Sequence, residues 1–465
     1  MKRIIISVIN DLATDQRVHR MTGTLIRQGY RVELIGRKLP GSLPVDLEEV
    51  MAQSAAIATE RNEDQVVLKG AKRKKDQVVL KGAKRKEDQV VPKTAKRKEN
   101  SDGQIESEEM MDLAAAYGSE DALNKEKRNA PAEVPAVPFT HLIRTRRFRM
   151  LVKRGPFFYV FYNTRLFFYL LFRQKPAMLV AVDLDTLTAN YLVSAFRRIP
   201  LLYDSHEYFT EVPELMDRPV VKRIWQRIER AIVPKLKAGI AVSESIAAVY
   251  RATYGVAFRA IRNVPVSLSP GVSGDLQDTY PSAYKLMYQG ALNRGRGIEL
   301  MIEAMRYIPD AVLFIVGDGD VRTDLQSQVH RLKLTDRVVF PGRLLPRHLS
   351  RITAQCDLGF SLEEDLGLNY RLALPNKIFD YIQARVPVLC SDLPEMASLV
   401  KTYSVGEVCR DRSPQALAEQ VREILKNKEK RDMWRIQLDQ AANALCWEME
   451  EQKLVEVVDA LLGEG

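Results

Sequence analysis

Five short apolar runs alternate with amphipathic segments between Lys285 and Asp392, and this alternation constrains the fold more than any other feature. The runs are KLMYQG, AVLFIVG, RVVFPG, CDLGFSL and VPVLCSD, and small or charged residues stand where they end. Such alternation predicts a parallel sheet with helices on both faces. Ligands of these sheets bind at the carboxyl ends of the strands. The charged residues gathered there suit a nucleotide diphosphate that carries a sugar.

The segment LPNKIFDY, residues 374–381, combines features of a phosphate and ribose site. Pro375 suits the first position of a helix, where its missing N–H costs nothing. The unpaired N–H groups at that helix end attract a phosphate, and Lys377 adds a full positive charge. Asp380 lies on the same helical face, where its carboxylate can accept hydrogen bonds from both ribose hydroxyls. The alternative is an ordinary helix start with a surface lysine and aspartate.

Glycine-rich turns follow the first two apolar runs. Gly290 ends the first run, and Arg294 and Arg296 come shortly after it. Glycine lets the backbone approach a ligand closely, and arginine grips phosphate oxygens with forked hydrogen bonds. Gly317 opens the sequence GDGD after the second run, which favours close packing beside the nucleotide. The alternative is a pair of ordinary turns with two solvated arginines.

The amino-terminal half shows the same alternation. Residues 3–9 are typical of a strand, residues 15–28 of a helix that Thr14 caps, and residues 30–36 of the next strand. Three later apolar runs, at 177–182, 201–203 and 240–242, are again followed by polar side chains. This half therefore predicts a second α/β domain.

An internal insert separates the first strands from the rest of that half. Residues 61–99 hold 14 Lys and Arg against 6 Asp and Glu, a balance of +8 out of the formal +10 of the chain. The sequence DQVVLKGAKRK occurs twice and DQVVPKTAKRK once, with a period of twelve residues. Residues 52–138 contain too few large apolar side chains for a core and are expected to be mostly disordered. The repeats have two interpretations. They form a basic tether that binds membrane or nucleic acid, or they are a selectively neutral repeat expansion in a loop that tolerates extra length. The second interpretation is favoured, so no nucleic-acid partner is expected.

The stretch from Arg144 to Lys175 has nine Lys and Arg, no acid and ten Phe and Tyr. Its apolar part, residues 157–172, is shorter than the ~20 residues of a membrane span. Arg165 would also lie in the middle of that span, at a cost of roughly 2.5–3.5 kcal/mol. Two interpretations stay open: a buried helix with a basic, aromatic rim near the acceptor cleft, or a surface that docks on an anionic bilayer.

The chain resembles the retaining glycosyltransferases of the GT-B fold, and family 4 of these enzymes in particular. The resemblance covers roughly residues 1–50 and 140–465, and it rests on the combination of Gly290, Arg296-Gly297, Gly317-Asp318-Gly319, Gly342-Arg343, Lys377 with Asp380-Tyr381, and Pro387-Val388. It implies an α/β fold in which two Rossmann-like domains face a cleft. The expected domains are 1–262 and 283–441, with a linker at 263–282 and a final helix at 442–465 that crosses back onto the first domain.

The resemblance implies transfer of a sugar from a nucleotide-diphosphate sugar, with retention at the anomeric carbon and without a metal or other cofactor. It implies phosphate contacts for Arg296 and Lys377, a ribose contact for Asp380, and a contact of His206 with the transferred sugar. The expected acceptor is lipid-linked or a polysaccharide. The predicted site consists of the catalytic residues His206, Arg296 and Lys377, the nucleotide-binding residues Gly290, Arg294, Arg296, Gly317, Arg343, Lys377 and Asp380, and the acceptor or sugar candidates Asn10, Asp11, Asp185, Glu207 and Glu364.

The chain departs from the family pattern at two places. Many relatives carry two glutamates eight positions apart, where this chain has Leu372 and Asp380, and it is open which nearby acid meets the donor sugar. Many relatives also have glycines after the first strand, where this chain has NDLATD. A nucleotide-sugar epimerase of related fold is one alternative. A catalytically silent scaffold that binds membrane or nucleic acid is the other, and the departures keep it open.

Acidic and sulfur-containing residues give no metal signature. Asp183 and Asp185 flank one residue, but no His or Cys cluster accompanies them, so loop ordering or acceptor binding is favoured. The four cysteines lack metal or redox spacing, and Cys390 lies in an apolar run typical of a reduced core thiol. A strand begins after two residues, so no signal peptide is expected. The expected location is the cytoplasm, and peripheral contact with the inner face of the membrane is the further option.

Overall fold

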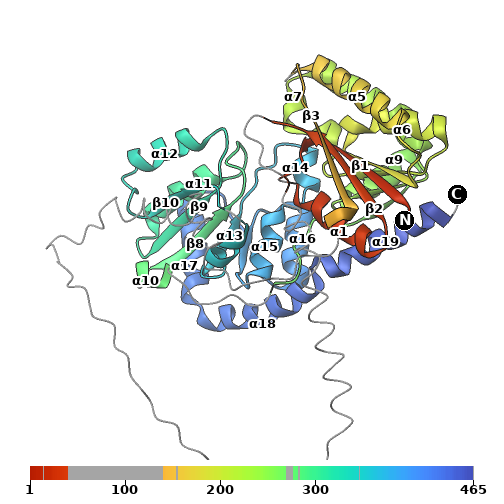
Figure 1. Cartoon of the computed structure of the whole chain (residues 1–465). Helices are drawn as coiled ribbons and strands as arrows, with labels where there is room; N and C mark the ends of the chain where they lie inside the picture. Colours follow the sequence, from red (N-terminus) through yellow and green to blue (C-terminus); the bar gives the residue numbers. More distant parts are fainter. Residues whose placement is uncertain are drawn as a thin grey trace, which may run out of the picture.

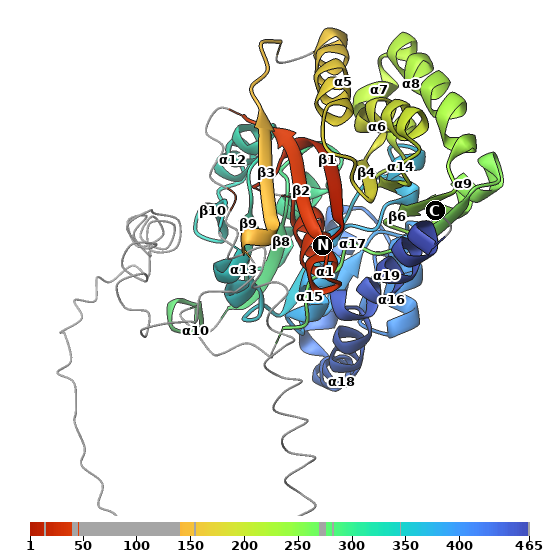
Figure 2. The ribbon, with the colours of Figure 1, turned by 45° about the vertical axis from the view of Figure 1, so that its right-hand side comes forward.

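The computed structural model describes residues 1–13, 15–39, 45, 140–152, 155–268, 276–280, 283–344 and 346–463. The repeats and the whole predicted insert at 52–138 lie outside the described residues. The described residues form two parallel sheets with helices packed on their faces, as Figures 1 and 2 show. This architecture confirms the predicted α/β fold with two Rossmann-like domains.

The first sheet has seven parallel strands in the order β3-β2-β1-β4-β5-β6-β7. Its strands are β1 Arg3–Asp11, β2 Arg31–Arg37, β3 Ile143–Phe148, β4 Met178–Val182, β5 Leu201–Ser205, β6 Ala238–Ala241 and β7 Ala257–Ala260. Its helices are α1 Gln16–Arg27, α5 Pro156–Leu171, α6 Leu184–Arg197, α7 Pro213–Met216, α8 Pro219–Ile232 and α9 Glu244–Tyr254. The strand order reverses between β1 and β4, and a ligand crevice is expected at such a reversal.

The second sheet has six parallel strands in the order β10-β9-β8-β11-β12-β13, with the reversal between β8 and β11. Its strands are β8 Tyr284–Gln289, β9 Ala311–Val316, β10 Val338–Gly342, β11 Leu358–Ser361, β12 Val388–Cys390 and β13 Gly406–Val408. Its helices are α10 Leu276–Thr279, α11 Ile298–Ala304, α12 Arg322–Arg331, α13 Pro346–Thr353, α14 Leu368–Leu372, α15 Asn376–Gln383, α16 Pro394–Tyr403, α17 Pro414–Lys426 and α18 Lys428–Ala444. The chain ends with α19 Trp447–Gly463, and short 3-10 turns lie at Thr140–Leu142, Phe209–Glu211, Val233–Lys235 and Met305–Tyr307.

Strand β1 divides the core of the first domain into two halves. All residues from Ile4 to Ile9 are buried, and alternate side chains point to opposite faces of the sheet. Ile4 and Ile6 belong to the cluster that includes the apolar face of α1, and Ile5 belongs to the cluster under α5 and α6. A strand buried on both faces is typical of a parallel sheet, and it explains the unbroken apolar sequence.

The last helix returns to the first domain. Trp447 is fully buried, its indole N–H donates to Thr24 Oγ1 of α1 at 2.9 Å, and its backbone N–H donates to the Pro265 carbonyl at 2.8 Å. Leu454 and Val458 of α19 are buried in one apolar cluster with residues of both domains. The residues from 442 onward are not one helix, because α18 ends at Ala444 and α19 begins at Trp447.

Two helix starts differ from the sequence expectation by one residue. Asp15 caps α1, since its side chain accepts the Val18 N–H at 3.1 Å, whereas the expected cap Thr14 lies outside the described residues. Pro375 precedes α15 with φ −63° and ψ 133°, so the helix begins at Asn376. A proline φ suits an extended residue as well as a helical one, and here ψ places it outside the helix.

The aromatic run after Arg144 forms a strand and a helix. Residues up to Phe148 make β3 at the edge of the first sheet, and the apolar part makes the sixteen-residue helix α5. Across the described ranges, every helix falls short of the length and apolar character that crossing a membrane requires.

Candidate functional site

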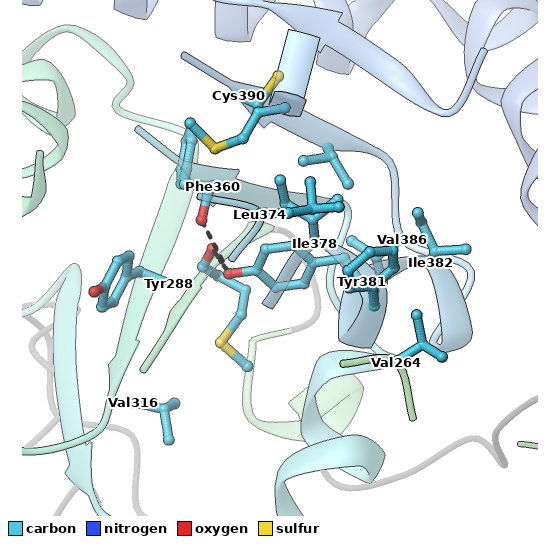
Figure 3. Packing of buried hydrophobic residues seen from close by; sticks show 14 of the residues in the cluster. Val264, Tyr288, Val316, Phe360, Leu374, Ile378, Tyr381, Ile382, Val386 and Cys390 are labelled. Atoms are coloured by element: carbon cyan, nitrogen blue, oxygen red, sulfur yellow. Dashed lines mark hydrogen bonds between the residues drawn. The ribbon is translucent and has the colours of Figure 1, made fainter. Parts of the chain in front are cut away.

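A tyrosine fixes the helix that carries the predicted phosphate contact. Tyr381 of α15 is fully buried, and its hydroxyl lies 3.1 Å from the Met287 carbonyl oxygen and 3.2 Å from that of Phe360 (Figure 3). The same hydroxyl accepts the Gln289 N–H at 3.2 Å. Because β8 and β11 are neighbours in the sheet, these bonds lock α15 against the point where the strand order reverses.

A cavity of about 420 Å³ lies between the two domains at these strand ends. This volume is in the range of small-molecule sites. Both domains and the linker contribute to its wall, which consists of His206, Glu207, Val242, Ile246, Asn263, Gln289, Gly290, Ala291, Arg296, Leu349, Glu363, Asn369, Tyr370, Ala373, Leu374, Pro375, Asn376, Lys377 and Asp380.

Two cations meet one buried carboxylate in this cavity. Lys377 Nζ lies 2.8 Å from Glu363 Oε1 and 4.2 Å from the centre of the Tyr288 ring. Arg296 approaches the same oxygen to 3.7 Å. Burial raises the pKa of Glu363, but the Lys377 and Arg296 charges outweigh burial and hold it below its ordinary value. The carboxylate therefore stays ionised and neutralises part of a doubly positive wall beside the amino end of α15.

Asp380 lies one helical turn farther along α15. Its carboxylate accepts a hydrogen bond from Gln289 Nε2 at 2.9 Å, and Thr353 Oγ1 fixes that amide by donating to Gln289 Oε1 at 2.8 Å. Burial raises the pKa of Asp380 to about 6, against opposing effects of Arg20, Gln289 and Lys377. A carboxylate held in this way can accept hydrogen bonds from a diol on the ligand.

Glycines shape the second-domain wall. Gly290 has φ +134°, a backbone conformation that favours glycine, and a Cβ placed there would make only an ordinary contact, at 3.5 Å, with Lys377 Cε. Gly317 has φ +145°, and a Cβ there would lie 1.9 Å from the Gly290 carbonyl oxygen. Gly317 itself does not line the cavity. The structure thus places it behind the Gly290 loop, in close packing beside the site.

A buried ion-pair network holds His206 on the opposite wall. Arg17 of α1 donates to both oxygens of Asp204, at 2.8 to 3.2 Å, and both side chains are inaccessible to solvent or nearly so. Asp204 Oδ2 lies 3.0 Å from His206 Nε2. Burial lowers the pKa of His206, but Asp204 and Asp183 raise it to about 9 on balance. The imidazole is therefore protonated and oriented at neutral pH.

Carboxylates surround this histidine. Asp183 Oδ1 accepts the His206 backbone N–H at 2.8 Å, and Asp183 has the unusual backbone angles φ 57° and ψ 166°. A residue other than glycine in this region costs of order 1–3 kcal/mol, so the surrounding contacts must hold it there. Glu207 lines the cavity, where burial and the neighbouring Asp183 and Glu214 carboxylates raise its pKa to about 7.

The cavity brings together some of the predicted residues and leaves out others. Of the catalytic and nucleotide-binding candidates, His206, Gly290, Arg296, Lys377 and Asp380 line it, and so does the acceptor candidate Glu207. Those outside its wall are Asn10, Asp11, Asp185, Arg294, Gly317, Arg343 and Glu364. Arg294 and Arg343 are exposed, and Asp11 forms a 3.5 Å ion pair with Arg147. Asp185 is buried beneath α5, where its carbonyl accepts from Asn163 Nδ2 at 2.7 Å.

Sequence reasoning did not single out several residues of the wall. Glu363 was one of three neighbouring acids, and only the fold shows that it, rather than Glu364, faces Lys377. Asn369 lines the cavity and bridges the domains, because its Oδ1 accepts the Tyr208 N–H at 3.0 Å. Tyr370 lies under the Arg296 guanidinium, 5.5 Å from it. Within the described ranges, no group of three or more His, Cys, Asp or Glu side chains is placed to hold a metal ion.

Comparison with known protein families gives a match over the second domain. Residues 278–439 match the family described as "Glycosyl transferases group 1". A curated relative, "Chitobiosyldiphosphodolichol beta-mannosyltransferase" of Candida albicans, is 30% identical over 108 residues, which are 23% of each chain. The match thus spans about a quarter of the length of that relative, and it shows a shared region rather than a shared activity.

Solved structures resemble the whole chain. The Anabaena protein Alr3699/HepE in complex with UDP and glucose has a TM-score of 0.63 at 13% identity, with 99% of this chain and 100% of that chain covered. Sucrose-phosphate synthase from Thermosynechococcus elongatus has a TM-score of 0.65 at 15% identity, with both chains fully covered. At these identities the likeness concerns the fold alone. The chain therefore has the GT-B architecture, and residues 278–439 in its second domain match the group 1 glycosyl transferases.

Proposed function

We propose that this protein is a retaining glycosyltransferase that moves a sugar from a nucleotide-diphosphate sugar to a lipid-linked or polysaccharide acceptor without a metal. The observation that carries this proposal is the interdomain cavity, in which Lys377 and Arg296 flank the amino end of α15 and Asp380 lies one turn away. Two cations and a helix amino end suit a diphosphate, and a carboxylate suits the ribose diol.

In the proposed reaction, the bond between the anomeric carbon and the diphosphate oxygen breaks. The acceptor hydroxyl oxygen forms its bond to that carbon on the same face, and its proton passes to the leaving phosphate oxygen. The products are the glycosylated acceptor and a nucleoside diphosphate. Lys377, Arg296 and the first N–H groups of α15 stabilise the charge that develops on the leaving group.

The donor competes with Glu363 for the two cations. Glu363 pairs with Lys377 at 2.8 Å, and Ser361 Oγ donates to its other oxygen at 2.7 Å. When phosphates engage the cations, this carboxylate is available to hydroxyls of the donor sugar. We therefore assign to Glu363 the sugar contact that the family gives to a glutamate at the position of Leu372.

The acceptor approaches from the wall that carries His206 and Glu207. A protonated His206 contacts the transferred sugar, and Glu207 suits a hydrogen bond to an acceptor hydroxyl. The Candida albicans relative is named for a lipid-linked acceptor, which supports the lipid-linked class.

Release of nucleoside diphosphate from a panel of nucleotide sugars tests the proposal. Uridine-diphosphate sugars come first, because the Anabaena structure contains UDP. We expect one donor class to be turned over, and product analysis by NMR to show the anomeric configuration of the donor. Absence of both turnover and nucleoside-diphosphate binding would contradict it. Interconversion of donor sugars without nucleotide release would indicate an epimerase instead.

A further inference from the structure

Helix α5 has two apolar faces, and the first domain covers only one of them. Phe158, Tyr162, Leu166 and Leu170 recur every four residues and are buried against the sheet. The outward stripe is Phe157, Phe161 and Phe168, exposed by 73%, 55% and 51%. These positions also recur at helical spacing, on the side opposite the buried stripe. A solvated helix normally has a polar outer face, so this stripe indicates a partner.

The apolar surface continues onto neighbouring residues. Phe172 caps α5 with 80% of its surface exposed, and its ring stacks on Phe168 with the centroids 6.2 Å apart. Helix α6 packs along α5, as Figures 1 and 2 show, and it exposes 78% of Phe196. Arg197 joins the two helix ends, because its guanidinium donates to the Leu170 and Arg173 carbonyls at 3.1 and 2.7 Å. We call Phe157, Phe161, Phe168, Phe172 and Phe196 the aromatic face.

The charge around the aromatic face is positive. No acid occurs from Arg144 to Lys175. Arg149 and Arg165 are exposed, and neither has a carboxylate partner within the part of the chain that the structure describes. Arg165 instead donates to the Arg149 carbonyl at 2.8 Å and lies 4.7 Å from the Phe148 ring centre. Aromatic rings flanked by unpaired arginines match the interfacial zone of a bilayer with anionic headgroups.

We infer that the aromatic face docks on the surface of an anionic lipid bilayer. The charge complementarity favours lipid over a second copy of this chain, whose aromatic face would bring the same positive charges together. Helix α5 follows β3, so its amino end lies at the carboxyl ends of the strands, on the side of the cavity. Its Tyr159 ring contacts Trp225, which contacts Phe209 in the loop after His206, with centroids 5.2 and 5.1 Å apart. Two ring contacts therefore link the helix that carries the aromatic face to the segment after His206 on the wall assigned to the acceptor, a consequence that rests on the proposed function.

Co-sedimentation of the full-length protein with phosphatidylcholine vesicles, with and without phosphatidylglycerol, tests this inference. We expect binding to the anionic vesicles and little binding to the neutral ones. Phe161→Ser combined with Phe168→Ser should weaken binding roughly tenfold or more, because two inserted rings are lost. Arg149→Ala combined with Arg165→Ala should also weaken it and reduce its sensitivity to salt.

Met433→Ser combined with Ile436→Ser is the matched control. These residues of α18 are exposed by 52% and 61%, so the pair removes similar apolar surface from the other domain and should leave vesicle binding unchanged. The basic insert is present in every variant and cannot explain a difference between them. Equal binding by the phenylalanine variant and the wild type would overturn the inference. So would a phenylalanine variant that changes only self-association in sedimentation equilibrium. Nucleotide release is measured separately, so failure of vesicle binding and failure of the proposed activity can be told apart.

Discussion

At the scale of single residues, the cavity depends on buried charges that stabilise one another. Arg17 fixes Asp204, and Asp204 bonds His206, so a guanidinium on α1 helps to position an imidazole just after β5. On the other wall, Glu363 pairs with both Lys377 and Arg296, and although burial lowers the pKa of Arg296, the Glu363 charge helps to raise it above its ordinary value. Removing one member of such a buried pair costs more than the pair contributes, because the other charge is left uncompensated.

Protein stability should depend on His206 between pH 6.5 and about 9. Its pKa in the folded protein lies above the ordinary value, so its contribution is fully present below pH 6.5 and is lost as pH rises through 9. That contribution is roughly 3 kcal/mol at most. Urea denaturation of the wild type and of His206→Gln should give free energies of unfolding whose difference shrinks over this range. A difference that stays constant with pH would show that His206 does not titrate there.

His206 and Asp380 should affect different kinetic quantities. His206→Ala is expected to lower kcat by roughly tenfold or more while nucleoside-diphosphate affinity stays nearly unchanged, because its contact lies on the reacting sugar. Asp380→Asn should mainly weaken nucleotide binding. Turnover and calorimetry on both variants check this division. Full turnover in His206→Ala would contradict the role given to this histidine.

The candidate site residues that the sequence predicts are those whose neighbours in the site are also close in the sequence. Lys377 and Asp380 were predicted because both lie in one short segment beside a proline. Glu363 was not singled out, because its partner Lys377 is 14 residues away and only the packing of β11 against α15 brings them together. Arg17 was missed altogether, since Asp204 lies 187 residues from it. Arg294 was predicted from its turn and Arg343 from the family resemblance, but both side chains are exposed and lie outside the cavity wall.

At the scale of elements, the strand period predicted the central strands of both sheets but missed the edge strands β3, β7 and β13. Tertiary contacts decided where several elements end. The turn at Leu445 between α18 and α19 contains no proline or glycine, so the local sequence does not predict a break in the helix there. Gln383 Nε2 of α15 donates to the Ala442 and Leu445 carbonyls at 2.7 and 3.1 Å. These two hydrogen bonds satisfy backbone carbonyls at the carboxyl end of α18. When a side chain far away in the sequence pairs with the free carbonyls of a helix end, the local sequence does not predict where the helix ends.

Tyr381→Phe should destabilise the second domain and weaken nucleotide binding together. The variant removes the hydroxyl that links α15 to β8 and β11, which should lower the free energy of unfolding by about 1–3 kcal/mol. Tyr403→Phe on α16 is the control, because Tyr403 is half-buried and its hydroxyl has no hydrogen bond among the described residues. Urea denaturation and calorimetry measure both effects. Equal stability of the two variants would show that the Tyr381 hydroxyl does not hold α15.

At the scale of the whole molecule, two connections and one apolar cluster join the domains. The linker before β8 and the passage from α18 to α19 both cross between them, and the cluster extends from β1 through α19 into the second domain. Polar contacts cross the cleft as well: Ser243 Oγ donates to the Leu372 carbonyl at 2.8 Å, and Glu395 accepts the Ser245 N–H at 2.7 Å. The shared apolar core and these hydrogen bonds therefore hold the two walls of the cavity in position relative to each other.

Deletion of residues 59–100 should leave the two domains and the contacts between them intact. The deleted range lies outside the described residues, and shortening a connection by less than half changes its closure free energy by less than about 0.6 kcal/mol. We expect Tm and donor turnover close to those of the full chain, measured by calorimetric scanning and nucleotide release. A large fall in Tm would mean that the repeats belong to the folded structure.

The most direct test of the donor-site assignment is titration calorimetry with the nucleoside diphosphate of the preferred donor. Lys377→Ala and Arg296→Ala should each raise Kd by roughly tenfold or more, equivalent to ~1.4 kcal/mol. Arg306→Ala removes a guanidinium that is exposed by 50%, pairs with Glu303 and lies outside the cavity wall, and it should bind like the wild type. Wild-type affinity in both Lys377→Ala and Arg296→Ala would contradict the assignment of this cavity to the donor diphosphate.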